Sequence, residues 1–280
     1  EHAMSEPVTR VFDTPTPVHL YVENGSGRVV VTTSDRTTTE VRVRGARATE
    51  VTVQEEGDRI SVIAPKNRTG FFGGDQHLDI EIHAGQGSHL VAKTGSADLT
   101  ASGPLGDVRL KSGSGESVLD QVDGVLVIDT GSGDVRVAGA AGDLKIRSGS
   151  GDVALDRTGG SASISTGSGD IRIAHARGPV VVKTGSGDLE IGEAESDVAS
   201  TTASGDVLVR AAHRGKISAK GASGDIRVGV PAGTPVWTDV STLSGRISST
   251  LQAVGEPEPG ADHLELRATT VSGDIALVPA

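Results

Sequence analysis

The chain has 280 residues and no cysteine, so disulfide bonds cannot stabilise it and its redox compartment cannot be read from the sequence. Glycine occurs 39 times and aromatic residues make up only 2%, so the core must be built from aliphatic and small side chains. The net charge of −11 argues against binding to nucleic acid or to an anionic lipid surface, because both need a basic surface.

The N-terminal third predicts strands without a common period. Residues 1–7 are expected to be a vector remnant and a disordered start, since the only methionine is Met4 and no basic or apolar signal region precedes it. Further on, runs of alternating apolar and polar residues predict irregular strands and a cap over residues 8–92. These runs are Leu20–Val22, Val29–Thr33, Val41–Arg44, Val51–Gln54, Ile60–Ile63, Leu78–Ile82 and Leu90–Lys93.

Two of the three phenylalanines, Phe71 and Phe72, are adjacent within a glycine-rich stretch of this region. Neighbouring residues on a strand face opposite sides, so simple alternation cannot bury both rings. Either one ring plugs the open end of the core, or one or both are exposed as an anchor for a partner or a lipid surface. Phe71 and Phe72 are therefore the candidate interaction residues.

From residue 93 to 228 a Gly-Ser-Gly-Asp tetrapeptide returns every eighteen residues, which is typical of a solenoid. Each repeat holds two alternating runs, such as Val135 with Val137 and Leu144 with Ile146, and these predict two strands whose apolar side faces a core. The clearest copies are Gly113-Ser114-Gly115-Glu116, Gly131-Ser132-Gly133-Asp134, Gly149-Ser150-Gly151-Asp152, Gly167-Ser168-Gly169-Asp170, Gly185-Ser186-Gly187-Asp188 and Ala203-Ser204-Gly205-Asp206.

Residues 229–280 are expected to form C-terminal coils and a cap. The spacing lengthens near Trp237, and the segment Gly255–Gly260, with two prolines, predicts an exposed loop. The sequence therefore predicts an all-β fold: a right-handed parallel β-solenoid with 18-residue, two-strand coils and irregular capping strands at both ends. We expect residues 8–280 to form a single domain.

Stacked coils turn the acid of each repeat into a column, and two interpretations compete for it. The carboxylates could bind calcium, as in the nonapeptide β-roll, or accept hydrogen bonds from turn amides and hydroxyls. The spacing of glycine and aspartate departs from the β-roll pattern, and the opposite turn lacks a regular acid, so the second interpretation is favoured. The column comprises Asp98, Glu116, Asp134, Asp152, Asp170, Asp188, Asp206 and Asp225.

A second column is hydroxylic and shares its parity with the buried Leu and Ile residues. It is expected to be an internal ladder that satisfies itself and the turn carbonyls. Its members are Thr94, Ser112, Thr130, Ser148, Thr166, Thr184 and Thr202.

Enzymatic chemistry finds little support. No cysteine nucleophile, phosphate-binding loop or metal-binding histidine spacing is present, and His77, His83 and His89 are expected to be surface residues. Parallel β-helix enzymes that act on polysaccharide carry groove aromatics, which this chain lacks. We therefore expect no catalytic, cofactor-binding or metal-binding residues.

The Gly-Ser-Gly-Asp units, with Asn24-Gly25-Ser26-Gly27 near the start and Leu243-Ser244-Gly245-Arg246 near the end, resemble the bacterial β-strand-repeat family of unknown function. That family is also called the toastrack or "putative adhesin" family, and the chain looks like its actinobacterial members. The resemblance implies a β-solenoid, and some relatives accompany envelope-stress systems.

Together these observations predict a non-enzymatic β-solenoid scaffold that presents a surface to a protein or cell-envelope partner. A β-helix enzyme acting on polysaccharide and a calcium-dependent β-roll are the alternatives. No cofactor, no nucleic acid and no membrane-spanning segment are expected, while the solenoid ends could mediate self-association. The expected location is cytoplasmic, although an exported form trimmed of its signal would have the same sequence.

Overall fold

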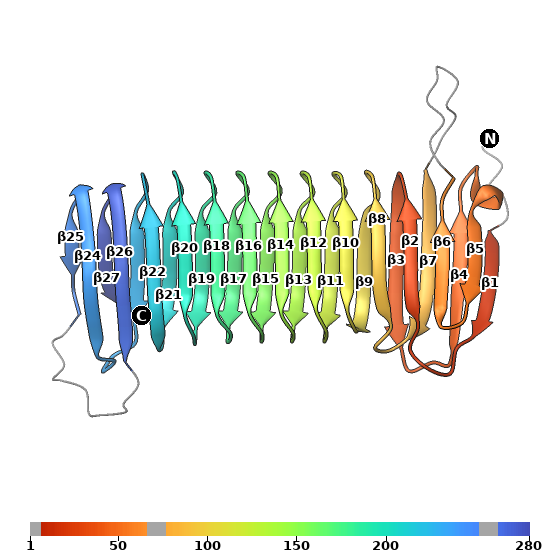
Figure 1. Ribbon diagram of the computed structural model, residues 1–280, viewed down its shortest axis with the longest axis horizontal. Helices are drawn as coiled ribbons and strands as arrows, with labels where there is room; N and C mark the ends of the chain where they lie inside the picture. The colour runs from red at the N-terminus through yellow and green to blue at the C-terminus, as the bar shows by residue number, and fades with distance from the viewer. Residues whose placement is uncertain (1–6, 66–76, 252–262) are drawn as a thin grey trace, which may run out of the picture. The chain divides into compact units, whose positions relative to one another are not determined.

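The computed structural model describes residues 7–65, 77–251 and 263–280. The chain divides into two compact units, Glu1–Gly142 and Asp143–Ala280, which are described in turn as unit 1 and unit 2. Each unit is built from two β-sheets, here called its first and second sheet (Figure 1). The all-β prediction is confirmed, and within the described residues the helical structure is a single 3-10 turn, Ala48–Glu50.

Unit 1 contains all seven strands predicted for its N-terminal part, together with one that the sequence did not reveal, Val8–Asp13. The strands are β1 (Val8–Asp13), β2 (His19–Asn24), β3 (Gly27–Ser34), β4 (Thr38–Arg44), β5 (Thr52–Glu56), β6 (Arg59–Ile63), β7 (Leu78–Gly85), β8 (His89–Thr94), β9 (Asp98–Leu105), β10 (Val108–Ser112), β11 (Ser117–Val122), β12 (Leu126–Thr130) and β13 (Val135–Ala140).

The N-terminal end of unit 1 combines parallel and antiparallel pairing. Its first sheet has the order β1-β4-β7-β3-β9-β11-β13, and its second sheet has the order β12-β10-β8-β2-β6-β5. The outer strands β1, β4 and β5 pair antiparallel, while β2 and β3 pair in parallel on both sides. The coil of β2 and β3 therefore lies between β6 with β7 and β8 with β9, which breaks the sequential order.

Unit 2 continues the two-strand repeat. Its strands are β14 (Leu144–Ser148), β15 (Val153–Thr158), β16 (Ala162–Thr166), β17 (Ile171–Ala176), β18 (Val180–Thr184), β19 (Leu189–Ala194), β20 (Val198–Thr202), β21 (Val207–Ala212), β22 (Gly215–Gly221), β23 (Ile226–Val230), β24 (Val236–Ser244), β25 (Ile247–Ser249), β26 (Leu264–Ser272) and β27 (Ile275–Pro279).

The first sheet of unit 2 has the order β15-β17-β19-β21-β23-β27-β25, and its second sheet has the order β14-β16-β18-β20-β22-β26-β24. The strand pairs described within unit 2 are parallel. Between β14 and β20, and between β15 and β21, each residue pairs with the one eighteen positions on, as the repeat predicts. The last coils are out of order, because β26 pairs with β22 on one side and β24 on the other, and β27 lies between β23 and β25 (Figure 1). Strands β26 and β27 are thus inserted between the coil of β22 and β23 and the coil of β24 and β25, and the spacing of the sequence did not predict this order.

The inward parity predicted for the repeat strands is confirmed. The predicted inward residues of the repeats are at most 4% exposed, including Leu119 in unit 1 and Ile164 and Ile173 in unit 2. Burying such side chains between two sheets contributes about 1.5–3 kcal/mol each relative to exposure. The alternate residues of the same strands lie on the outer faces.

The second glycine of the tetrapeptide is required for close stacking rather than for an unusual backbone angle. A Cβ atom built on Gly187 would lie 1.9 Å from the carbonyl oxygen of Gly169 in the preceding coil, and one on Gly205 would lie 2.0 Å from that of Gly187. Neither glycine has a positive φ. A side chain at Gly187 or Gly205 would therefore force adjacent coils apart.

Several sequence-based predictions stay predictions. The strand order and pairing do not test the right-handed sense of the coil. They also do not test the single domain over residues 8–280 or its division into 8–92, 93–228 and 229–280. Residues 1–6 of the vector remnant and disordered start expected over residues 1–7 lie outside the described residues, as do the Phe71 and Phe72 pair and the Gly255–Gly260 loop.

Candidate functional site

The acids of the repeat turn form a hydrogen-bonded ladder. In unit 2, the carboxylate oxygen Oδ1 of each aspartate accepts a bond from the backbone N–H of the equivalent residue in the adjacent coil. The distances are 2.8 Å from Asp170 N to Asp152, 3.0 Å from Asp188 N to Asp170, 2.8 Å from Asp206 N to Asp188 and 2.8 Å from Asp225 N to Asp206. In unit 1 the N–H of Glu116 donates to Asp98 over 2.9 Å.

This ladder explains why an acid recurs in the turn. Each of these aspartates satisfies a backbone donor of the adjacent coil, as the hydrogen-bond interpretation of the column predicted. At the C-terminal end the ladder follows the spatial order of the coils rather than the order of the sequence. Asp274 N donates to Asp225 and Arg246 N donates to Asp274, each over 2.7 Å. It stops there, because Arg246 offers no carboxylate to a further coil.

The opposite turn carries a partial copy of this ladder, which the sequence analysis missed. The Oδ1 atoms of Asp107 and Asp143 accept from backbone N–H groups eighteen residues on, over 2.8 and 2.9 Å, and that of Asp197 accepts from Lys216 over 2.8 Å. The signal was present: these aspartates are 36 and 54 residues apart, which is two and three repeats. It was hidden because the intervening coils carry other residues at the same position.

The hydroxyl column is internal, as predicted. Its side chains are buried. From Ser112 to Thr202 each hydroxyl bonds to the backbone of the glycine three residues later, whereas Thr94 Oγ1 has no hydrogen-bond partner in the structure. Ser148 Oγ donates to the carbonyl of Gly151 over 3.0 Å, and Thr184 Oγ1 accepts the N–H of Gly187 over 3.0 Å. The hydroxyls thus satisfy turn amides as well as turn carbonyls, and they are not available to a ligand.

The three histidines of the N-terminal region are not brought together into one site. His77 lies 3.4 Å from a carboxylate oxygen of Asp79, whereas His83 lies in the middle of β7 and pairs across the strands with Glu40. His89 stacks on His19, with ring centroids 4.6 Å apart. Among the described residues no cluster of three or more histidines or acids is placed to hold a metal ion.

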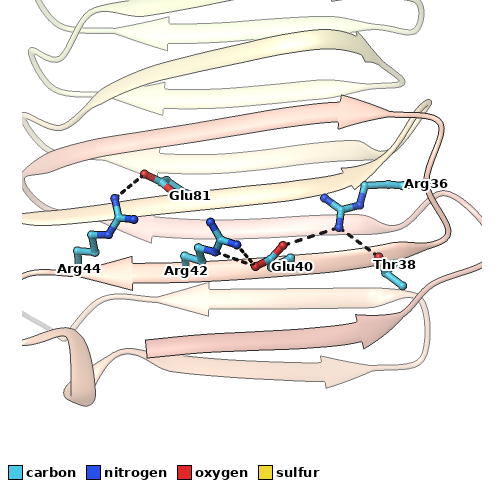
Figure 2. A network of polar contacts seen from close by, with 6 residues as sticks. All are labelled: Arg36, Thr38, Glu40, Arg42, Arg44 and Glu81. Carbon is cyan, nitrogen blue, oxygen red and sulfur yellow. Dashed lines mark hydrogen bonds and ion pairs between the residues drawn. The ribbon is translucent and has the colours of Figure 1, made fainter. Parts of the chain in front are cut away.

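The outer face of β4 and β7 in unit 1 is covered by a network of ion pairs (Figure 2). Glu40 contacts Arg36 and Arg42, at 3.8 and 2.6 Å, and Arg44 contacts Glu81 at 3.0 Å. Positive and negative groups alternate here and neutralise one another. This surface therefore presents little net charge to a partner.

Shifted pKa values occur where charged groups meet on the outer faces. The hydrogen bond to the Tyr21 hydroxyl, followed by that to Glu23, raises the pKa of Lys93 in unit 1. The hydrogen bond from Lys216, supported by Arg267, lowers the pKa of Glu265 in unit 2. On the N-terminal side the bond to Glu50 raises the pKa of Arg47. All three shifts arise from side-chain hydrogen bonds on the outer surface.

The outer face of the second sheet in unit 2 has a different character from the surfaces above, because it is rich in cations. Its outward positions carry two acids, Glu265 and Asp239, and Glu265 is paired with Lys216 at 3.1 Å and Arg267 at 2.8 Å. The outward cations on these strands are Lys145, Arg147, Lys183, Lys216, Lys220 and Arg267. The negative net charge of the chain thus conceals a locally basic face.

The last coil of unit 2 exposes apolar side chains. Trp237 on β24 is 52% exposed and lies beneath the guanidinium of Arg267, and Leu243 on the same strand is 84% exposed. Strand β24 pairs only with β26, so its other edge is open among the described residues. The predicted interaction residues Phe71 and Phe72 lie outside the described residues, so their role stays a prediction.

Comparisons with known proteins agree with this architecture. The model of the Toastrack DUF4097 family matches residues 18–192 and again 174–278. No match is found among curated proteins. In the part of the chain that the structure describes, no helix is long and apolar enough to cross a bilayer.

Several solved bacterial structures show some similarity to this chain. A Parabacteroides distasonis protein described as a "putative lipid binding protein" is 17% identical, with a TM-score of 0.48, covering 98% of this chain and 97% of that chain. A "putative adhesin" from Parabacteroides merdae is 12% identical with a TM-score of 0.40 and the same coverage. One from Bacteroides fragilis is 10% identical with a TM-score of 0.35, covering 98% of each chain. These values are too low to transfer a function.

Proposed function

Because this chain belongs to the Toastrack DUF4097 family, we propose that it is a non-enzymatic β-solenoid scaffold whose outer faces bind a protein or a component of the cell envelope. Binding of this kind needs a large, regular surface rather than a cleft. The inward sides of the strands are committed to the core and the turns to hydrogen bonding between coils. The outer faces are what the fold leaves available.

The observation that carries the proposal is the register of the outer residues. In unit 2 each outward side chain lies beside the equivalent residue of the next coil, for example Lys183 beside Thr201 and Thr201 beside Lys220. Neighbouring strands are about 4.8 Å apart. The fold therefore displays straight columns of side chains at a constant spacing, which suits a partner that is itself extended or repetitive.

The alternative of a β-helix enzyme acting on polysaccharide would need carboxylates that converge away from the repeat columns. The turn carboxylates instead accept backbone hydrogen bonds, and Glu265 is neutralised by two cations. A calcium-dependent β-roll would need the same turn oxygens as ligands. The hydrogen bonds of the ladder favour the scaffold.

Co-sedimentation with isolated envelopes of the native host tests this proposal. The purified protein is expected to pellet with the envelopes and to release no reducing ends or unsaturated products from their polysaccharides. Protein that stays in the supernatant under all salt conditions, or that cleaves a polysaccharide catalytically, would overturn it.

A further inference from the structure

One line of outward side chains on the second sheet of unit 2 alternates in chemistry between cations and hydroxyls. It is formed by Arg147, Ser165, Lys183, Thr201, Lys220 and Thr269, here called the cation–hydroxyl column. The strand register places each of these residues directly beside the next. Six successive strands therefore present cation, hydroxyl, cation, hydroxyl, cation and hydroxyl.

The column is accessible and contains no acid. Lys183, Lys220, Ser165 and Thr201 are all exposed. Within the described ranges neither Lys183 nor Lys220 has an ion-pair partner, so their ammonium groups are available to an external anion. Since the protein as a whole has a charge of −11, this concentration of one sign on one face is not a consequence of composition.

The corresponding line in unit 1 shows that the fold does not require this pattern. There the register brings together Glu23, Lys93, Lys111 and Asp129, two acids and two cations. Lys93 contacts Glu23 at 3.3 Å. The charges of that line therefore cancel, whereas the charged residues of the line in unit 2 are all cations.

The spacing defines the ligand that fits. Cations on alternate strands are about 9.6 Å apart, twice the strand separation. This is close to the length of two sugar units in an extended chain, so a hydroxyl between two cations would face the neutral sugar of each pair. We infer that the cation–hydroxyl column binds an extended anionic polysaccharide with one acidic group per two sugar units. The inference rests on the proposed scaffold function and names its partner.

Other anionic partners fit the column less well. Single-stranded nucleic acid is bound through aromatic platforms between the cations, and the column has none. A bilayer would be helped by apolar side chains that enter it, but the residues between the cations are serine and threonine. An anionic polysaccharide of the envelope lies outside the cytoplasm, so the inference favours the exported form of the protein over the expected cytoplasmic location.

The test measures binding of the full chain to hyaluronate, which carries one carboxylate per two sugar units, at low ionic strength. The double variant Lys183→Glu with Lys220→Glu is expected to bind at least about tenfold more weakly, and wild-type binding is expected to weaken as salt is added. The matched control is Arg157→Glu with Arg227→Glu, which makes the same charge change at exposed positions on the first sheet of unit 2. The control is expected to bind within about twofold of wild type.

A second variant, Ser165→Ala with Thr201→Val, tests the hydroxyls and is expected to weaken binding about threefold. The inference is overturned if this variant binds as wild type, or if both charge variants weaken binding equally. It is also overturned if single-stranded DNA, phosphatidylglycerol vesicles or the more densely charged polygalacturonate bind as tightly as hyaluronate. If wild type and Lys183→Glu with Lys220→Glu pellet equally with host envelopes, this inference fails while the scaffold proposal stands.

Discussion

The inward and outward sides of the strands in unit 2 are built under different constraints. Inward side chains must fill a fixed space between two sheets, so most inward positions carry aliphatic residues, such as Ile164 and Ile173. Outward positions vary freely, from Ser165 to Lys183 in neighbouring coils. The comparison shows that the core and the turns specify the fold, while the outer columns are free to acquire a binding function. Unit 1 and unit 2 accordingly differ in their outer columns and share the inward pattern.

The largest expected effect comes from exchanging the two sides. Ile164→Asp should lower the free energy of unfolding by about 4 kcal/mol or more, because an unpaired charge would lie between the sheets. Ser163→Asp, one residue away on the outer face and beside Lys145 in the register, should change it by less than about 0.5 kcal/mol. Urea unfolding followed by circular dichroism measures both, and equal effects would contradict the inward parity.

A smaller loss is expected from crowding the turn. Gly187→Ala should cost about 3 kcal/mol, since its Cβ would collide with the carbonyl oxygen of Gly169. Ser186→Ala, at the exposed neighbouring position, is the control and should be nearly neutral. Thermal unfolding of the two variants distinguishes steric stacking from general turn sensitivity. Similar melting temperatures for both would show that coils can separate without penalty.

The buried hydroxyls sharpen the comparison further, because they are polar groups on the inward side. Thr184→Val keeps the shape of the side chain but removes the acceptor of the Gly187 N–H. We expect a loss of about 1.5 kcal/mol in the free energy of unfolding, from an unsatisfied buried donor. Amide hydrogen exchange at Gly187 should accelerate at the same time, and unchanged exchange there would mean that the hydroxyl does not hold the turn.

The smallest effect should have the opposite sign. Ser200 occupies an inward position in β20, and its hydroxyl has no hydrogen-bond partner in the structure. Ser200→Ala should therefore raise the free energy of unfolding by about 1 kcal/mol. Chemical denaturation checks this, with Thr201→Ala on the outer side as the neutral control. A loss of stability in Ser200→Ala would indicate that the hydroxyl is satisfied after all.

Much of this fold follows from local sequence signals. Alternation between residues 20 and 93 located seven strands, and the eighteen-residue period gave the coil and its inward residues, because strand parity and coil length are properties of adjacent residues. The order of the end coils did not follow, since nothing local distinguishes a strand that pairs with the next coil from one that pairs with the coil beyond it. Val8–Asp13 was missed because only weak alternation marks this edge strand.

The candidate binding surface was hidden for another reason. Overall charge is a sum over all faces, so the acids of the turns masked the cations of one sheet. The alternation of Lys183, Thr201 and Lys220 appears only when the coils are stacked in register. Applying the repeat period to the outward residues would have revealed it. The paired aromatic residues Phe71 and Phe72, which drew attention in the sequence, stay a prediction.

The inserted position of β26 and β27 has a consequence for how the protein is made. A ribosome delivers β24 and β25 before the strands that hold them, because both pair with residues synthesised later. Until β26 and β27 emerge, β22 and β23 also lack their outer partners. The coils formed by β22 to β25 can therefore be completed only after residues 264–279 have left the exit tunnel. If translation were arrested before residue 264, the unpaired edges of β22 and β23 would be exposed to other chains that are being translated from the same mRNA.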